Sequence, residues 1–319
     1  MAWRYIVNET QGLTFAMTKK LKILVSLPTR ENDFQVEQAA SAEQMARKLG
    51  IILEISYADN DAVNQSTQIL KALQRDPATR PDGIVFEPVG RDALPRVSRA
   101  ARDAGVGWAV LNRAPDYVSE LRSGATAPIF TLTSDHVEIG RIQGRQFAAL
   151  LPNGGCVLYI EGPSQSSSAN KRTSGMLETK PSNIRVRPLK ARWTQESAQR
   201  AVCSWLCLAT SKKAEFDLVG AQDDSMAMGA RKAFEEMSDK RERDAWLSLP
   251  FTGCDGVPKA GQTWVSNGLL AATVHIPPLA GQAIDMLARA IQNGVQPPET
   301  SITVSVSIPS LMALAARKP

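Results

Sequence analysis

The sequence predicts an α/β protein made of two doubly wound parallel sheets, each resembling a Rossmann lobe. Short apolar runs bounded by turn residues recur along the chain, and segments with apolar residues at helical spacing separate them. The length of 319 residues also exceeds the usual size of one domain, which favours two domains of about 150 residues each. Ligands of such folds bind beyond the carboxyl ends of the strands.

The first half of the chain contains four predicted strands. Apolar runs of this kind, with no alternation of polar residues, are typical of strands buried on both faces. They begin about 30 residues apart, which is the length of a βαβ unit. Apolar residues at helical spacing lie between them and predict three crossover helices. The four runs are 21–28, 51–59, 82–88 and 107–113.

A second set of predicted strands repeats this rhythm further along the chain. The segments between them are rich in Ala, Leu, Met and charged residues, which favour helices. The plan of the first lobe is therefore expected again in the second. The four runs are 155–162, 184–192, 217–224 and 247–256.

Three further extended segments do not fit two domains joined head to tail. They are 129–135, 270–277 and 301–308, and a predicted helix at 278–294 precedes the last of them. We expect these three segments to cross between the lobes and to form a hinge that bends without swivelling. The helix is then expected to return and cover the first lobe.

The predicted organisation therefore has three parts. Residues 1–20 form an N-terminal extension, which lacks the apolar segment of a secretion signal. The first lobe comprises residues 21–134 plus 277–302. The second lobe comprises residues 135–276 plus 303–319.

Composition and charge exclude several classes of protein. Hydrophobic residues make up 43% of the chain and charged residues 22%, as in ordinary globular proteins. The net charge of +5 is spread along the chain, so no nucleic-acid partner is expected. No apolar run is long enough for a transmembrane helix, so direct membrane insertion is not expected.

Neither the cysteines nor the common catalytic motifs indicate an enzyme. Cys203 and Cys207 lie four apart on a predicted helix, whereas Cys156 and Cys254 lie at predicted strand ends; this spacing matches neither a disulfide framework nor a zinc site. Phosphate-binding loops, metalloprotease motifs and nucleophile elbows are not found. The sequence therefore predicts no catalytic residue, metal or cofactor.

Seven short strings occur in an order and spacing that resemble a known family. They are PDGIVFEP, VLNR, TSDHVEIGRIQGRQFA, SANKRTSG, GAQDDSMAMGARKAF, TGCDG and NGLLAATVHIP. Together they are similar to the type I periplasmic sugar-binding proteins, among them the ribose-binding group, and to the effector domains of lactose-repressor-type regulators. Nothing before residue 21 resembles the helix-turn-helix of those repressors, which favours a binding protein.

The resemblance implies a clamp of two lobes that closes on a monosaccharide or polyol. It also implies a monomer in the periplasm or cell envelope, with a membrane permease or a sensor receptor as partner and an ABC-type uptake role. A cytoplasmic sensing module without a DNA-binding part is the alternative, which the absence of a visible secretion signal favours.

Five polar residues just past predicted strands are candidate ligand contacts: Glu87, Asn112, Arg113, Asp223 and Asp255. Such positions face the cleft where open α/β sheets bind ligands. Each could instead be an ordinary turn or cap residue. Their recurrence at strand ends favours function for the set.

The resemblance adds residues outside the strand ends. Phe34 and Trp193, one from each lobe, would stack on the two faces of a sugar ring, although core packing is the alternative for both. Arg113 and Arg172 would donate hydrogen bonds, and Asn32 would accept them with the carboxylates. Asn32 is equally a candidate helix cap. The complete set of predicted ligand contacts is Asn32, Phe34, Gln35, Glu87, Asn112, Arg113, Arg172, Trp193, Asp223, Asp255 and His275.

Several positions depart from the ribose-binding pattern and put ribose in doubt as the ligand. Glu87, Asn112, Asp223 and Cys254 replace an amide, a carboxylate, an amide and an aromatic ring, and Ile276 stands where a glutamine would reach the sugar. Three carboxylates against two arginines make the site slightly acidic. This balance disfavours sugar phosphates and sugar acids, and permits neutral sugars, polyols or an amino sugar.

Overall fold

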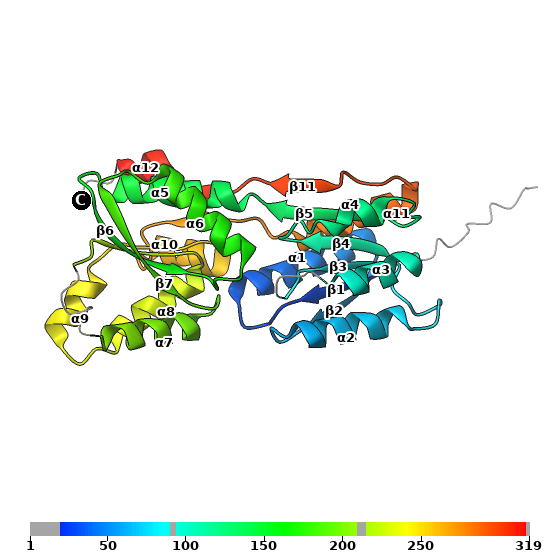
Figure 1. Ribbon diagram of the computed structural model, residues 1–319, viewed down its shortest axis with the longest axis horizontal. Helices are drawn as coiled ribbons and strands as arrows, with labels where there is room; N and C mark the ends of the chain where they lie inside the picture. The colour runs from blue at the N-terminus through cyan, green and yellow to red at the C-terminus, as the bar shows by residue number, and fades with distance from the viewer. Residues whose placement is uncertain (1–19, 90–93, 209–214, 317–319) are drawn as a thin grey trace, which may run out of the picture.

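The computed structural model describes residues 20–89, 94–208 and 215–316, and in it two lobes are each built on a parallel sheet (Figure 1). The predicted fold class is confirmed. Of the predicted N-terminal extension, residues 1–19 lie outside the described part of the chain. Among the described residues, no helix has the length and apolar character needed to cross a membrane.

The first lobe contains a six-stranded sheet in the order β11-β5-β4-β3-β1-β2, with every neighbouring pair parallel. Residues of β1, β3, β4 and β5 are almost all buried, as expected for strands covered on both faces. The strands are β1 (Lys22–Leu27), β2 (Ile52–Tyr57), β3 (Gly83–Phe86), β4 (Gly107–Leu111), β5 (Ile129–Ser134) and β11 (Thr300–Thr303).

Two helical layers cover this sheet. Helices α1 (Asp33–Leu49) and α11 (Ala280–Asn293) pack on one face, and their apolar residues share a core with β1, β3 and β4. The opposite face carries α2 (Ala62–Leu73), α3 (Pro95–Asp103) and α4 (Tyr117–Arg122). The predicted helix at 278–294 is thus α11, and it covers the first lobe.

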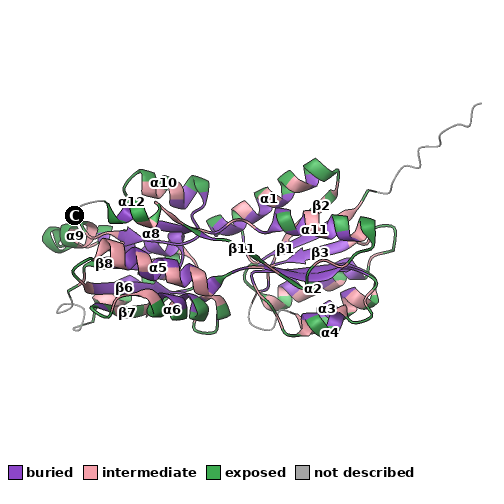
Figure 2. Cartoon of the chain, turned by 90° about the horizontal axis from the view of Figure 1, so that it is seen from above, coloured by how far each residue is buried: buried purple, intermediate pink, exposed green. Residues whose placement is uncertain are grey.

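The second lobe repeats the plan with a four-stranded parallel sheet in the order β7-β6-β8-β9. Helices α5 and α6 cover one face, and α7 and α8 cover the other. Figure 2 shows the buried residues concentrated in the sheets of both lobes. The elements are β6 (Gly155–Glu161), β7 (Ile184–Lys190), β8 (Leu218–Ala221), β9 (Phe251–Thr252), α5 (His136–Leu150), α6 (Ser167–Thr179), α7 (Gln195–Leu206) and α8 (Asp224–Glu235).

Shorter elements complete this lobe. Strand β10 pairs with β12 in an antiparallel ribbon, and single parallel bridges join residues 252 and 272 and residues 255 and 275. All four cysteines are free. The elements are α9 (Lys240–Leu247), a π-helical turn (Pro258–Gln262), α10 (Thr263–Ser266), β10 (Thr273–His275), β12 (Val306–Ile308) and α12 (Leu311–Ala315).

The chain passes between the two sheets at three places. These are the junction of β5 with α5, the segment between β10 and α11, and the segment between β11 and β12. In Figure 1 the two lobes lie side by side and these connections join them.

Two predicted strands are corrected by the structure. The run 301–308 is divided between β11 and β12, which belong to different sheets, because the chain leaves the first sheet after Thr303. The run 247–256 contains only the two-residue strand β9, since Leu247 ends helix α9 and the following residues form turns. In the run 301–308 the alternation of apolar residues continues through the break and does not mark it, whereas Pro250 and Gly253 interrupt the run 247–256.

Helices α5 and α6 approach each other closely because glycines lie at their interface. A methyl group added at Gly140 of α5 would overlap the backbone carbonyl of Arg172 in α6. A methyl group added at Gly175 of α6 would overlap the carbonyl oxygen of Val137 in α5. The glycines at this interface therefore determine how closely α6, which carries Arg172, packs against α5.

The variant Gly140→Ala tests this close packing through the sign of its effect on stability. Helix propensity alone would raise the free energy of unfolding by roughly 0.5–1 kcal/mol. Overlap with the backbone of α6 should outweigh this gain and lower the free energy of unfolding by about 1–3 kcal/mol. Urea unfolding measures the difference, and a stabilised variant would contradict the packing argument.

Candidate functional site

A cavity of about 620 Å³ lies between the two lobes, beyond the carboxyl ends of the strands of both sheets. This size falls within the range of about 300–1,000 Å³ typical of small-molecule sites. Ten of the eleven predicted contact residues line it: Asn32, Phe34, Gln35, Glu87, Asn112, Arg113, Arg172, Trp193, Asp223 and Asp255. Among the described residues, no cluster of His, Cys, Asp or Glu could hold a metal ion.

Asn32 caps helix α1 and also joins the two lobes. Its Oδ1 accepts hydrogen bonds from the backbone amides of Phe34 (2.9 Å) and Gln35 (3.3 Å). Its Nδ2 donates to the carbonyl oxygen of Trp193 (3.0 Å) and to Oδ2 of Asp223 (3.1 Å), both in the second lobe. The side chain of Asn32 thus makes four hydrogen bonds within the protein in this structure, and its role as an acceptor for the ligand stays a prediction.

A second polar contact joins the lobes beside Asn32. The hydroxyl of Ser225, in the first turn of α8, donates to Oδ2 of Asp33 at the start of α1 (3.2 Å). Because α1 belongs to the first lobe and α8 to the second, these contacts exist only where the two lobes approach each other. We refer to Asn32, Asp33, Asp223 and Ser225 as the interlobe latch.

Glu87 follows β3 and forms the polar wall of the first lobe. Amides of Gln35, Gln38 and Asn112 donate to its carboxylate, and Arg113 attracts it electrostatically. Burial nevertheless raises the pKa of Glu87 above its usual value, because these partners offset only part of the loss of water. Arg113 lines the same cavity and has its own pKa lowered by burial.

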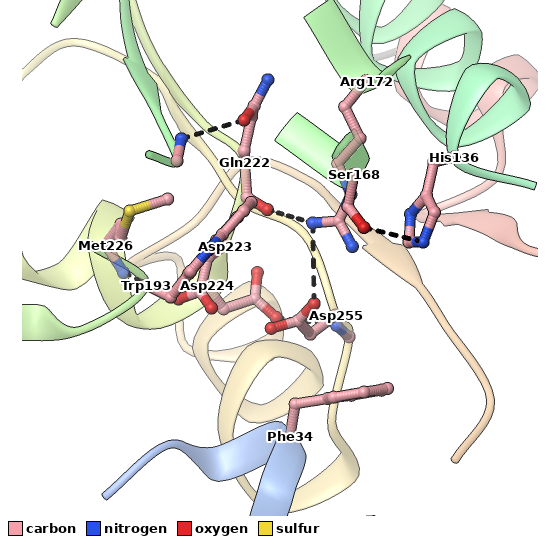
Figure 3. A network of polar contacts seen from close by, with 12 residues as sticks. Phe34, His136, Ser168, Arg172, Trp193, Gln222, Asp223, Asp224, Met226 and Asp255 are labelled. Carbon is pink, nitrogen blue, oxygen red and sulfur yellow. Dashed lines mark hydrogen bonds and ion pairs between the residues drawn. The ribbon is translucent and has the colours of Figure 1, made fainter. Parts of the chain in front are cut away.

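Arg172 of α6 is the central cation of the second lobe and is only 6% exposed (Figure 3). Its Nη1 donates to the carbonyl oxygen of Gln222 and lies 4.0 Å from Oδ1 of Asp255. The Gln222 side chain in turn accepts from the Gly162 amide (3.0 Å) and donates to the carbonyl oxygen of Ala169 in α6 (3.0 Å). Gln222 therefore fixes the position of α6 relative to β8.

Asp223 and Asp255 form a coupled carboxyl pair beside Arg172. Both are nearly completely buried, and their side chains hydrogen-bond to each other. Burial raises the pKa of both groups, and the proximity of Asp223 raises that of Asp255 further. Two adjacent buried carboxyl groups favour sharing one proton. Asp223 also caps α8, because its carboxylate accepts a hydrogen bond from the backbone amide of Met226 (3.0 Å).

The aromatic rings of Phe34 and Trp193 line the same cavity from opposite lobes. Phe34 comes from the first turn of α1 and packs in an apolar cluster with second-lobe residues such as Cys254. The ring of Trp193 covers Gly162, where an added methyl group would overlap it. The guanidinium carbon of Arg172 lies 5.5 Å from the centroid of this ring, at cation–π distance.

Four cavity residues have left-handed backbone conformations. Their φ angles are +59° for Asn60, +57° for Asn112, +63° for Trp193 and +107° for Asp255. Such values are uncommon outside glycine and cost conformational energy. Their concentration in one cavity indicates that the local backbone is arranged for the site and not for the strand or helix that follows.

His136 lies at the start of α5, where the chain passes from the first lobe to the second. Its Nε2 is 3.3 Å from the carbonyl oxygen of Asn112 and 3.1 Å from the hydroxyl of Ser168. Burial, reinforced by the charge of Arg172, lowers the pKa of His136 to about 3. The imidazole is therefore neutral at physiological pH, and it lines the cavity next to the crossover.

His275 is the one predicted contact that does not line the cavity. Its Nδ1 is 2.9 Å from the carbonyl oxygen of Gly256, and its backbone packs against the same glycine. The next residue, Ile276, lines the cavity instead. Because successive side chains of an extended segment point to opposite sides, only one of the two can face the cavity.

Other cavity residues were not among the predicted contacts. Arg192 and Arg200 line the cavity from either side of the start of α7, and Ser168 lines it from α6. Arg192 immediately precedes Trp193 in the sequence, so its position next to a predicted contact is a signal that could have found it. Ser168 and Arg200 lie on helices, where no strand end marks them.

Comparison with known proteins gives a consistent result. The family model described as "Periplasmic binding protein domain" matches residues 23–295. A putative rhizopine-binding protein of Rhizobium meliloti is 30% identical over 200 residues, which is 60% of each chain. The galactofuranose-binding protein of Escherichia coli is 25% identical over 297 residues, covering 92% of this chain and 89% of its own.

A solved structure supports the fold independently. The periplasmic solute-binding protein of an ABC transporter from Actinobacillus succinogenes, with bound D-allose, superposes with a TM-score of 0.77. It is 20% identical, and the match covers 92% of this chain and 99% of that one. At this identity the likeness concerns the fold.

The interlobe latch predicts that Asn32→Ala has two separate effects. Loss of the α1 cap should lower the free energy of unfolding by about 1 kcal/mol. Loss of the two bonds to the second lobe should also shift the ligand-free protein toward open forms, which small-angle X-ray scattering detects as a larger radius of gyration.

Asp61→Ala is the matched control for the latch. Asp61 caps α2 in the same way, by accepting from Val63 and Asn64, but it makes no bond to the second lobe. It should lose similar stability without a change in the radius of gyration. Equal radii for the two variants would show that Asn32 is only a cap.

The Asp223–Asp255 pair predicts a pH-dependent effect of Asp255→Asn. The folded protein holds a proton that the unfolded chain loses near pH 4, so the free energy of unfolding of the wild type should fall as the pH rises from about 4 through the raised pKa of the pair. The asparagine variant lacks this pH-dependent contribution to the free energy of unfolding. Its stability relative to the wild type should increase by up to about 1.4 kcal/mol per pH unit in that window, and a difference that stays constant between pH 4.5 and 8 would contradict it.

Proposed function

This chain belongs to the family of periplasmic binding protein domains, and we propose that its two lobes close on one small neutral sugar or polyol in the cavity between them. The chain is a solute-binding protein of the monosaccharide and polyol class, and its family is not enzymatic. The observation that supports the site most strongly is the convergence of ten predicted contacts from both lobes on one cavity.

Each part of the cavity suits one feature of a sugar. Phe34 and Trp193 offer apolar ring faces to the C–H faces of the ligand. Glu87, Asp223 and Asp255 accept hydrogen bonds from hydroxyl groups, and the arginines donate to hydroxyl and ring oxygens. Because these groups are divided between the lobes, a ligand satisfies all of them only when the lobes are closed.

The charge balance favours a neutral ligand. A proton shared by Asp223 and Asp255 reduces the negative charge of that pair, and Arg172 and Arg113 lie in the same cavity. Arg192 and Arg200 also line the cavity, but both side chains are exposed, so water screens their charges. A sugar phosphate or sugar acid would bring an additional buried negative charge next to three carboxyl groups, which is costly.

Closure would be achieved by bending at the three chain crossings. The interlobe latch would then stabilise the closed form, and the ligand would supply further contacts from both sides. We propose that the closed protein delivers its ligand to a membrane permease in the cell envelope as the binding component of an ABC-type importer. The relatives named above support this role through the family that they share with this chain.

A thermal-shift screen of neutral pentoses, hexoses and inositols tests the proposed function. A ligand present at 100 times its Kd stabilises the folded protein by about 2.7 kcal/mol and should raise its melting temperature. Trp193→Ala should abolish this shift, because one of the two stacking rings is lost. Trp193→Phe is the control that retains a ring and should retain most of the shift. If the alanine variant responds as the wild type does, the ring does not contact the ligand.

A further inference from the structure

The residue that follows β10 brings an apolar side chain to the cavity. Polar side chains follow β3, β4 and β8, and Asp255 lies three residues beyond β9, whereas the residue directly after β10 is Ile276. It lines the cavity and is only 2% exposed. At this strand end the cavity therefore has an apolar wall.

This wall continues behind Ile276 into an apolar cluster. Its neighbours in that cluster include Phe34, Cys254 and Val274, which are all buried. The backbone amide of Ile276 donates to the carbonyl oxygen of Asp255 (2.9 Å), so it is already occupied. Neither the side chain nor the amide of Ile276 can bond a hydroxyl group placed against it.

The same backbone bond fixes the place of the wall relative to the polar groups. Ile276 is tied directly to Asp255, whose carboxyl group is one of the acceptors of the cavity. Both residues line the same cavity, so a ligand that fills it can meet the carboxyl group of Asp255 and the apolar side chain of Ile276 together.

We propose that Ile276 is a specificity-determining residue that selects ligands with an apolar substituent against this wall, namely a deoxy position or a methyl group, over those with a hydroxyl group there. The inference rests on the proposed function and narrows it to deoxy or methyl-bearing sugars and polyols. A hydroxyl buried against Ile276 would lose its bonds to water without replacement. A methyl group there would gain apolar contact, which in a hydrophobic pocket changes affinity by about tenfold or more.

Matched ligand pairs test this inference by isothermal titration calorimetry on the full chain. Suitable pairs are L-fucose with L-galactose, D-fucose with D-galactose, L-rhamnose with L-mannose, 2-deoxy-D-ribose with D-ribose, and pinitol with D-chiro-inositol. In each pair the two members differ by one hydroxyl group or by its methylation. For the pair whose differing group meets Ile276, the deoxy or methylated member should bind at least about tenfold more tightly.

Variants at position 276 show whether this residue causes the preference. Ile276→Gln supplies a donor and an acceptor and should reverse the preference toward the hydroxylated member. Ile276→Leu keeps an apolar wall of the same volume and should retain the wild-type order. If the glutamine variant does not fold, Ile276→Thr introduces a hydroxyl in a smaller side chain and should narrow the ratio of the two affinities. The readout is this ratio within a pair, which a general loss of stability would not change.

The outcomes separate the inference from the function on which it rests. If sugars or polyols bind but the hydroxylated member of every bound pair binds equally or better, the inference is wrong and the proposed function stands. An unchanged ratio in both polar variants also overturns it. If no member of the panel and no ligand of the thermal-shift screen binds, the proposed function fails, and the inference fails with it.

Discussion

The part of the site in the second lobe depends on the contacts that hold the buried guanidinium group of Arg172. A cation with so little exposure must be held by oppositely charged or polar groups, because an unpaired buried charge is strongly destabilising. The carbonyl oxygen of Gln222, the Asp223–Asp255 pair and the ring of Trp193 surround it. The glycine contacts between α5 and α6 set the depth of the helix that carries it. Fold and site are therefore linked at this residue, since the packing that stabilises the lobe also places the cation.

The link between the lobes depends on a different residue, Asn32. One carboxamide caps α1 with its oxygen and reaches the second lobe with its nitrogen. The first turn of α1 also carries Phe34 and Gln35 into the cavity, so the cap orients residues that line it. A movement of the lobes that breaks the latch separates Asp223 from Asn32, and with them the cavity residues of the two lobes. In the proposed function, closure of the lobes and completion of the site are therefore the same event.

The sequence predicted the fold class and most of the cavity because both follow from the ends of buried strands. Glu87, Asn112, Asp223 and Asp255 could be found because each follows an apolar run, and the resemblance to a family added Phe34, Arg172 and Trp193. The sequence could not show that Asn32 caps α1 and also bonds the second lobe, because this depends on the approach of the two lobes. It also could not choose between His275 and Ile276, because a shift of one residue in an extended segment exchanges the buried and the facing side chain.

The acid groups and the apolar wall act on different parts of the free energy of binding. In the proposed function the carboxyl groups and arginines exchange water for ligand hydroxyls, and each such exchange contributes only about 1 kcal/mol net, or about 1.5–3 kcal/mol where a charged group takes part. Affinity therefore needs several of them together with the stacking of Phe34 and Trp193. Discrimination works differently, because a hydroxyl that meets no partner costs about as much as a good bond contributes. A polar side chain at position 276 would add one more bond for ligands with a hydroxyl there. The isoleucine instead makes a hydroxyl group at that place unfavourable. The site can therefore bind a hydroxylated analogue more weakly without binding the preferred ligand more tightly.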